Sequence, residues 1–339
     1  MLQTCVRASK NYPIIISDDL SAFSDLLKYL KGDKVAIVTD DIVGDLYGAA
    51  LDDFLKEKSV YKFVIRHGEQ SKNAENYIKI LNGLAKNGFT RSDSVIALGG
   101  GVVGDLAAFI ASTYMRGINL VQVPTTILSA VDSSVGGKTA INLDEGKNLC
   151  GTFYQPNAVY IDINFLSTLP EREIFCGYGE IIKYAFLSKN ITEADLTGKI
   201  SEDLVYKCLK IKADIVEADE KEGGARKLLN LGHTVGHAIE RLSDFSLSHG
   251  ECVVKGIFAV LGASKKYYGF SNEIYDSALK IISARGHDLS NPFTVDEIME
   301  QIRCDKKSGS DFVDAVLIDS DLSAKVERIS FEKFRELLE

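Results

Sequence analysis

The chain has 339 residues, of which 45% are hydrophobic and 26% are charged, the proportions of an ordinary globular protein. Lysine and arginine number 39 against 48 acidic residues, which gives a net charge of −9. This acidic balance argues against a nucleic-acid-binding protein, because such proteins need a broad basic surface, and any basic cluster should form a local pocket for a small anion.

The first half of the chain alternates short β-branched runs with longer amphipathic segments. Strands are predicted at 34–39, 61–65, 94–98, 120–123 and 158–161, and helices at 44–58, 74–87 and 102–114. Alternating strands and helices with apolar strands favour a parallel sheet that helices cover on both faces. We therefore expect a Rossmann-like α/β domain over residues 1–165.

After Pro170 the periodicity becomes helical. Helices are predicted at 171–188, 204–220, 234–242, 251–268 and 274–284, with a small hairpin that pairs 315–318 with 324–329. We therefore expect a mainly α-helical second domain over residues 166–339. No Pro/Ser-rich linker separates the two halves.

Six cysteines are scattered along the chain without paired spacing, which is typical of reduced thiols. The first residues show no signal-peptide pattern, and no apolar stretch approaches the length of a membrane span. We expect a cytoplasmic protein without a membrane partner.

The segment 94–105 runs from a buried strand through glycines into a helix. Gly99, Gly101 and Gly104 satisfy the pattern G-x-G-x-x-G, in which glycines and a helix N-terminus accept a pyrophosphate. A tight turn without a ligand is the alternative, because the usual acidic ribose partner is missing downstream. A second segment, 132–139, nearly spells a Walker A loop, but Asp132 stands in place of its first glycine and an ATPase is not expected.

Three of the five histidines, His233, His237 and His249, fall within a short stretch. The first two are four residues apart and share a helix face. A catalytic zinc site needs three protein ligands, often two histidines and a carboxylate, and Glu180 on an apolar helix is a candidate carboxylate. The spacing does not decide which two histidines bind, and hydrogen-bonded packing histidines are the alternative.

Basic residues recur in polar segments that contain glycine, and Lys183 shares a helix face with Glu180. Several cations beside a metal would suit a small polyanion such as a phosphate ester with a carboxylate. These residues are Arg116, Lys138, Lys147, Lys183, Lys212 and Arg226.

The chain resembles the 3-dehydroquinate synthase family of sugar-phosphate cyclases over nearly its whole length. The resemblance is carried, in order, by GEQSK (68–72), GGGVVGD (99–105), YMRG (114–117), PTT (124–126), DSSVGGKTAIN (132–142), EGKN (145–148), LPEREIFCGYGEIIKY (169–184), LNLGHTVGHAIE (229–240), SHGE (248–251) and DKK (305–307). Each stretch is a weak signal alone, but ten in the same order are specific.

The resemblance implies a role for each matching position. Metal ligands would be Glu180, His233 and His249, and proton transfer would use His237 and Glu222. NAD contacts would be Asp40, Glu69, Lys72, Gly100, Gly101, Val102, Asp105, Thr125, Thr126, Lys147, Phe165, Leu166, Ser167 and Thr168. Substrate contacts would be Asp132, Lys138, Asn148, Lys183, Lys212, Arg226, Asn230 and one of Lys306 and Lys307. Arg116, Lys138 and Lys183 would also act beside the reacting groups.

The same resemblance implies NAD, a divalent zinc or cobalt ion, a phosphorylated sugar acid as substrate and a homodimer. The implied reaction converts 3-deoxy-D-arabino-heptulosonate 7-phosphate into 3-dehydroquinate. Alternatives are a sister cyclase of the 2-deoxy-scyllo-inosose or aminodehydroquinate synthase type, a metal-dependent polyol dehydrogenase, and a non-catalytic binding module. Three positions depart from the family pattern: Ile42, Ala108 and Lys255.

Overall fold

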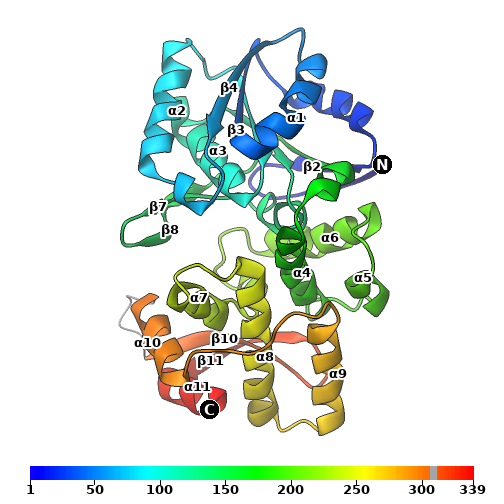
Figure 1. Ribbon diagram of the computed structural model, residues 1–339, viewed down its shortest axis with the longest axis vertical. Coiled ribbons are helices and arrows are strands. Elements are labelled where there is room, and N and C mark those ends of the chain that lie inside the picture. The colour runs from blue at the N-terminus through cyan, green and yellow to red at the C-terminus, as the bar shows by residue number, and fades with distance from the viewer. Residues whose placement is uncertain (306–310) are drawn as a thin grey trace. The chain divides into compact units, whose positions relative to one another are not determined.

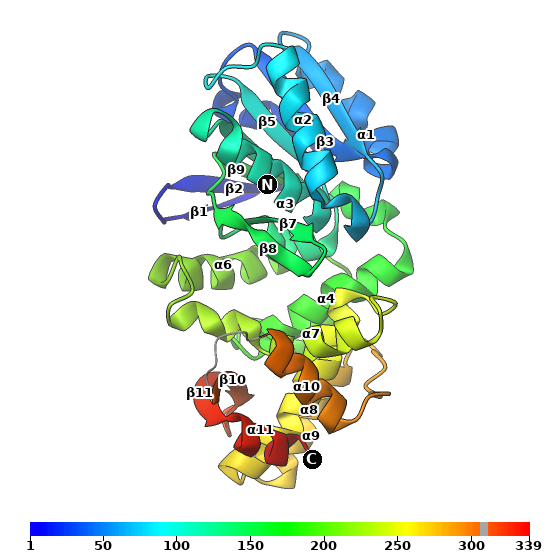
Figure 2. The same cartoon turned by 90° about the vertical axis from the view of Figure 1, so that its left-hand side faces the viewer.

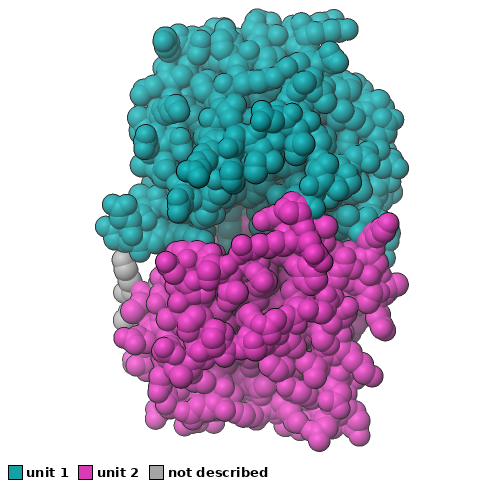
Figure 3. Space-filling model, viewed as in Figure 1, with its two compact units in different colours: residues 1–169, 200–220 teal, residues 170–199, 221–339 magenta. Residues whose placement is uncertain are grey.

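The computed structural model describes residues 1–305 and 311–339, so Lys306 and Lys307 of the predicted substrate site lie outside the described residues. The chain divides into two compact units (Figure 3). The first comprises residues 1–169 and 200–220, and the second comprises residues 170–199 and 221–339.

A seven-stranded sheet forms the centre of the first unit (Figure 1). Its order is β1 (Leu2–Val6), β2 (Tyr12–Ser17), β9 (Ala158–Asp162), β6 (Asn119–Pro124), β5 (Ser94–Gly99), β3 (Lys34–Asp40) and β4 (Ser59–Ile65). Only the β1–β2 pair is antiparallel. The five predicted strands are confirmed, whereas β1 and β2 were not predicted.

Successive side chains of a strand point to opposite faces of the sheet. In this sheet the apolar side chains on both faces are covered by helices. Ala36 and Val38 pack in the apolar cluster that includes residues of α2 (Ala74–Lys86) and α3 (Gly101–Thr113). Val35 and Ile37 pack in the cluster on the other face, with the 3-10 segment η1 (Leu20–Tyr29) and α1 (Asp41–Phe54). The predicted α/β domain is thus confirmed.

A two-stranded hairpin of β7 (Lys138–Leu143) and β8 (Gly146–Phe153) also belongs to the first unit (Figure 2). Most side chains of β8 are exposed, so its sequence lacks the alternation that marks a half-buried strand. At Gly151, a Cβ atom would lie 1.9 Å from the Thr139 carbonyl oxygen. Glycine is therefore required for the two strands to approach here.

The second unit is mainly helical, as predicted, with one small sheet. Its helices are α4 (Glu171–Ala185), α5 (Glu193–Thr197), α7 (His233–Leu242), α8 (His249–Tyr268), α9 (Asn272–Ser283), α10 (Val295–Asp305) and α11 (Phe331–Leu338). The predicted hairpin is present as β10 (Phe312–Ile318) paired with β11 (Ala324–Ser330). Helices α5, α10 and α11 were not predicted. None of the described helices is long and apolar enough to cross a membrane.

Helix α6 (Glu202–Ala218) groups with the first unit, although a single division at residue 165 would place it in the second. Carboxylates at its C-terminal end explain the grouping. Glu217 accepts a hydrogen bond from the Arg7 backbone N–H at 2.8 Å, and Glu220 accepts one from the Ser9 backbone N–H at 2.8 Å. Glu220 also accepts a bond from the side-chain amide of Gln155.

Candidate active site

Three helices of the second unit approach unusually closely because glycines face one another. At Gly250 on α8, a Cβ atom would lie 1.8 Å from the Cys176 carbonyl oxygen of α4. At Gly256, farther along α8, a Cβ atom would lie 2.0 Å from the carbonyl oxygen of Gly232, the residue that caps α7. Larger residues at these contacts would force the helices apart. The glycines therefore bring Glu180, His233 and His249 to one place.

One carboxylate oxygen lies beside two imidazoles at this place. Glu180 Oε1 is 3.3 Å from His233 Nε2 and 3.2 Å from His249 Nε2. Ligand atoms bound to one tetrahedral ion at about 2.0–2.2 Å lie about 3.3–3.6 Å apart. The two distances from Glu180 are therefore at the short end of the range for a zinc or cobalt site, and the donor set of two imidazoles and one carboxylate suits either ion.

A different set of three ligands is also possible by distance, since the ring nitrogens of His233, His237 and His249 lie within 4.8 Å of one another. In the set containing Glu180, the carboxylate is 1% exposed and its oxygen is within 3.3 Å of one ring nitrogen of each histidine. A buried carboxylate needs compensating charge, which Lys183 supplies and a bound cation would increase. His237 is exposed to solvent, which leaves it accessible for proton exchange.

The ionisable groups of this cluster shift one another's pKa values. Burial opposes ionisation of Glu180, but Lys183, with which it forms an ion pair, and His233 hold the pKa of that carboxyl well below its usual range. Burial also opposes the charged form of His249, yet hydrogen bonds from its ring to Glu180 and Glu240 raise its pKa to about 9. Desolvation by the protein around the ring, and then the neighbouring His233 and His249, lower the pKa of His237, although part of its side chain reaches solvent. His237 therefore stays neutral, and its lowered pKa makes it a weaker base than a free imidazole.

Further predicted substrate residues lie in the same unit. Arg226, on the 3-10 segment η6 (Ala225–Asn230), has a side chain buried to 1% exposure. The Asn230 side-chain amide donates a hydrogen bond of 2.7 Å to Glu222 Oε1, and Glu222 itself has a φ of 63°. Left-handed backbone is costly for a residue other than glycine and is commonest at functional sites. These observations support, but do not test, the predicted roles of the three residues.

The glycine turn of the first unit joins β5 to α3. Gly100 is the N-cap of α3 and no side chain caps the helix, so its first N–H groups point to an open end. A Cβ atom at Gly100 would lie 3.0 Å from Thr126 Cγ2, and one at Gly101 would lie 3.2 Å from Ser133 Oγ. The glycines therefore let Thr126 and Ser133 pack against the turn, and Gly100, Gly101 and Val102 remain half-buried. A glycine turn before an uncapped helix N-terminus fits the phosphates of a dinucleotide.

A charged network lies near this turn. Lys72, which is buried, forms ion pairs with Glu69 at 3.0 Å and with Asp105 at 3.1 Å. Burial opposes its charge, but the two carboxylates raise the pKa of Lys72. Glu69 also accepts a hydrogen bond of 2.8 Å from Asn142. Three of the predicted NAD residues are thus brought together.

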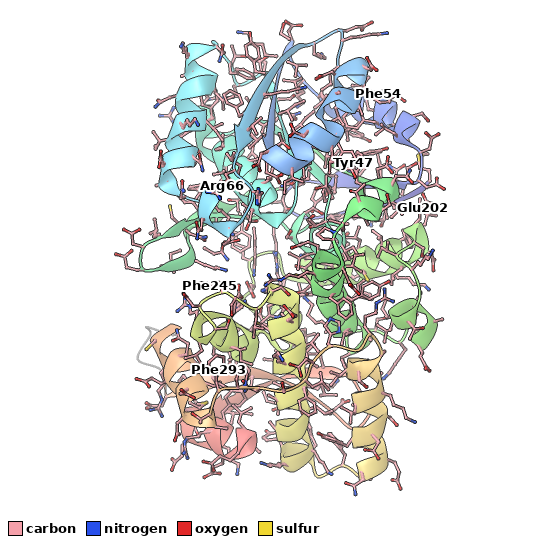
Figure 4. The ribbon with its side chains drawn as sticks, in the orientation of Figure 1. Tyr47, Phe54, Arg66, Glu202, Phe245 and Phe293 are labelled. Carbon is pink, nitrogen blue, oxygen red and sulfur yellow. The ribbon has the colours of Figure 1, made fainter. Side chains whose placement is uncertain are left out.

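The remaining predicted NAD residues occupy strand ends and a short turn. Asp40 caps α1 by accepting a hydrogen bond from the Val43 N–H at 2.9 Å, and Thr125 follows β6. Phe165, Leu166, Ser167 and Thr168 lie in the 3-10 segment η5 (Ile163–Thr168). Tyr47, on α1 (Figure 4), bonds with its hydroxyl to the Phe165 carbonyl at 3.2 Å and to Thr168 Oγ1 at 2.5 Å. Tyr47 was not predicted, because no spacing in the sequence relates it to this turn.

The first unit also holds several predicted substrate residues. Lys212 on α6 forms an ion pair of 3.1 Å with Asp132. Lys138 begins β7 rather than a helix, so the structure contradicts a Walker A loop here. Arg116 and Asn148 have φ angles of 65° and 59°, again left-handed backbone. Lys147 lies beside Asn148 on β8.

The three departures from the family pattern have different surroundings. Ala108 is buried in the apolar cluster beneath α3, where its methyl group packs, and Ile42 is exposed on α1. Lys255 is buried in α8, but its ammonium donates to the carbonyl oxygens of Asp288 and Ser290 at 2.7 and 2.6 Å and to the Asp288 carboxylate at 3.0 Å. Its charge is therefore fully compensated.

Family models match most of the chain. The model of the 3-dehydroquinate synthase N-terminal part matches residues 62–176, and that of the C-terminal part matches residues 177–308. A 3-dehydroquinate synthase from Alkaliphilus metalliredigens is 42% identical, over 83% of each chain. One from Halalkalibacterium halodurans is 41% identical, over 99% of this chain and 96% of the relative.

Solved structures share the fold at lower identity. The structure of 2-deoxy-scyllo-inosose synthase with carbaglucose-6-phosphate, NAD+ and Co2+ has a TM-score of 0.90 and 23% identity, covering 99% of both chains. That of 2-epi-5-epi-valiolone synthase from Streptomyces hygroscopicus, with NAD+ and Zn2+ bound, has a TM-score of 0.87 and 23% identity, covering 98% of this chain and 97% of the other. A probable glycerol dehydrogenase from Sinorhizobium meliloti is more distant, with a TM-score of 0.60, 16% identity and coverage of 96% and 95%.

Proposed function

Because the chain belongs to the 3-dehydroquinate synthase family, we propose that Glu180, His233 and His249 hold the divalent zinc or cobalt ion of a phosphate-eliminating cyclase. The observation that carries this assignment is the single Glu180 oxygen within 3.3 Å of one ring nitrogen of each histidine. The glycine turn and the Lys72 network are the matching site for NAD.

The reaction is that of a 3-dehydroquinate synthase, a lyase of the shikimate pathway of aromatic amino-acid biosynthesis. It converts 3-deoxy-D-arabino-heptulosonate 7-phosphate into 3-dehydroquinate and phosphate by transient oxidation, elimination, re-reduction and intramolecular aldol closure. When bound, the ion supplies Lewis-acid stabilisation of substrate oxygens, and NAD supplies a hydride acceptor that is regenerated in each turnover.

The second unit contributes charge and proton handling. Lys183 and Arg226 are buried cations whose side chains are 1% exposed, so an anionic group beside them is held in a poorly screened field. His237 is the proton acceptor that the family resemblance implies, and its side chain is reachable from solvent. Glu222, positioned by Asn230, is the second proton acceptor.

The first unit contributes cofactor and substrate orientation. Gly100, Gly101 and Val102 bind the cofactor phosphates, and the pairs of Lys72 with Glu69 and Asp105 fix the neighbouring polar groups. The substrate phosphate and hydroxyls are held by residues of the short π-helix η4 (Ser129–Ser133), α6, the β7–β8 hairpin and the turn before β6. These residues are Arg116, Asp132, Lys138, Asn148 and Lys212.

Phosphate release tests this function. Protein loaded with Zn2+ or Co2+ is incubated with the heptulosonate phosphate and NAD, and inorganic phosphate and NADH are followed together. We expect many turnovers of phosphate release without net NADH. Glucose 6-phosphate as an efficient substrate would favour a sister cyclase, and stoichiometric NADH would favour a polyol dehydrogenase; either result would overturn the proposal.

We also propose a cytoplasmic homodimer. The location is supported by the cysteines, all six of which lie in the described part of the chain and none of which is in a disulfide. The dimer is supported by apolar side chains that β8 leaves exposed, Leu149 and Phe153. Light scattering should give twice the 37.1 kDa chain mass at micromolar concentration, and a constant monomer mass would contradict the dimer.

A further inference from the structure

The His249 ring lies between two carboxylates, one at each nitrogen. Its Nε2 atom is 3.2 Å from Glu180 Oε1, and its Nδ1 atom is 3.3 Å from Glu240 Oε2. Glu240 lies on α7 and is 9% exposed. From this geometry we propose that Glu240 is a positioning residue that accepts the Nδ1–H of His249 and so presents Nε2 to the metal, an inference that rests on the proposed function.

The chemistry of imidazole ligands supports this role. A histidine that binds a metal through one nitrogen carries its proton on the other, and a partner for that N–H fixes both the tautomer and the ring orientation. A carboxylate partner also makes the ligand more basic than a neutral partner does. Glu240 therefore strengthens the bond of His249 to a cation without touching the cation.

The other imidazole of the site has a different partner. His233 Nδ1 lies 3.1 Å from the Leu231 backbone carbonyl, a neutral group that no side-chain substitution removes. The two histidines therefore differ in the charge of the group at Nδ1, which is a carboxylate for His249 and a neutral carbonyl for His233. A substitution of Glu240 should act on the ring of His249 and leave that of His233 in place.

Both members of the pair are held rigidly. Ser248 and Glu251 form a capping box at the start of α8, in which the Ser248 N–H donates to Glu251 Oε2 at 2.7 Å, and this fixes the backbone of His249. Glu240 follows His237 by three residues and His233 by seven, so all three share one face of α7. The ring thus meets a carboxylate whose position the helix determines.

The test compares Glu240→Ala and Glu240→Gln with the wild-type chain by Zn2+ affinity, measured against a competing chelator. Loss of such a partner commonly costs about 10–100-fold in metal affinity. We expect that loss for Glu240→Ala and a smaller one for Glu240→Gln, whose amide oxygen can still accept the bond. Glu336→Gln is the matched control, because it makes the same substitution at an exposed carboxylate of α11 that pairs with Lys333 and not with a histidine.

A second readout separates positioning from general structural damage. Nitrogen-15 NMR of the zinc-loaded histidine rings should show a shifted His249 Nδ1 resonance in both Glu240 variants and an unchanged His233 resonance. Unchanged zinc affinity and an unchanged His249 resonance in Glu240→Ala would overturn the inference. If the wild-type chain itself binds no Zn2+, the proposed function fails first; if His249→Ala loses zinc while Glu240→Ala keeps it, only the role of Glu240 fails.

Discussion

Gly179 of α4 and Gly250 of α8 are in direct backbone contact: a Cβ atom at Gly179 would lie 2.4 Å from the Gly250 carbonyl oxygen. No side chain larger than hydrogen fits at either position while the helices keep this separation. Because Glu180 follows Gly179 and His249 precedes Gly250, this contact sets the distance between two of the proposed metal ligands.

Gly250→Ala should therefore destabilise the second unit and weaken zinc binding. Overpacking of this kind costs about 1–3 kcal/mol, and here the obstacle is rigid backbone. Urea unfolding and zinc titration would measure the two effects. Gly262→Ala on the same helix is the control: no atom would lie within 4 Å of its Cβ, so it should leave zinc binding unchanged and stabilise the helix by about 0.5–1 kcal/mol. Equal behaviour of the two variants would contradict the packing argument.

His249→Ala should remove one of three proposed ligands and abolish both zinc retention and turnover. The sheet of the first unit contains no part of α8, so its fold should survive, which NAD binding would report. His67→Ala, which changes an exposed histidine paired with Asp41, should keep the zinc. A His249→Ala protein with full zinc content and rate would show that another residue is the ligand.

Lys72→Met should weaken NAD binding, since the substitution leaves Glu69 and Asp105 facing each other without their shared cation. Losing a charged hydrogen-bond partner costs about 1–3 kcal/mol, part of which should reduce NAD affinity. Calorimetric NAD titration is the measurement, with Lys79→Met, at an exposed position of α2, as the control. Identical NAD affinities in all three proteins would count against the cofactor site.

Stability at acid pH should depend on Asp288. Hydrogen bonds from the Ser290 backbone and then from Lys255 lower the pKa of Asp288 from 3.8 to about 2. A carboxyl whose pKa is lower in the folded state stabilises the fold above the unfolded pKa, and this contribution disappears as pH falls through the folded pKa. The difference in urea midpoint between wild type and Asp288→Asn should therefore be constant above pH about 4 and shrink towards pH about 2. A difference that does not change with pH would contradict the lowered pKa of Asp288 in the folded protein.

Most of the strands predicted correctly are mainly apolar runs, whether they are buried throughout, as β5 is, or partly exposed, as β4 is. Strands such as β5 are apolar throughout because helices cover both faces, and this gives a strong local signal. Strand β2 contains Pro13 and ends beside two aspartates, and β8 is mostly exposed, so neither carries the expected pattern. Strand β2 was missed although it is almost wholly buried, and β8 was missed because its pairing with β7 leaves no apolar pattern in the local sequence.

In the candidate site, too, some residues could be predicted from the sequence and others could not. Glu180, His233 and His249 could be singled out because histidines are few and a carboxylate on an apolar helix is unusual. Glu240 shares a face of α7 with two histidines, a signal that spacing does contain, but its contact with His249 depends on how α8 packs. The helix–helix contact at Gly179 and Gly250 has no signature in a single sequence.

The chain passes from one unit to the other three times, after residues 169, 199 and 220. During synthesis, α4 leaves the ribosome before α6, although α6 completes the earlier unit by binding the turn after β1. The nascent chain therefore contains α4, the first helix of the second unit, before α6 can join the first unit. A cut inside residues 171–219 would leave neither unit complete in one fragment, so a separately expressed unit needs residues from both sides of this segment.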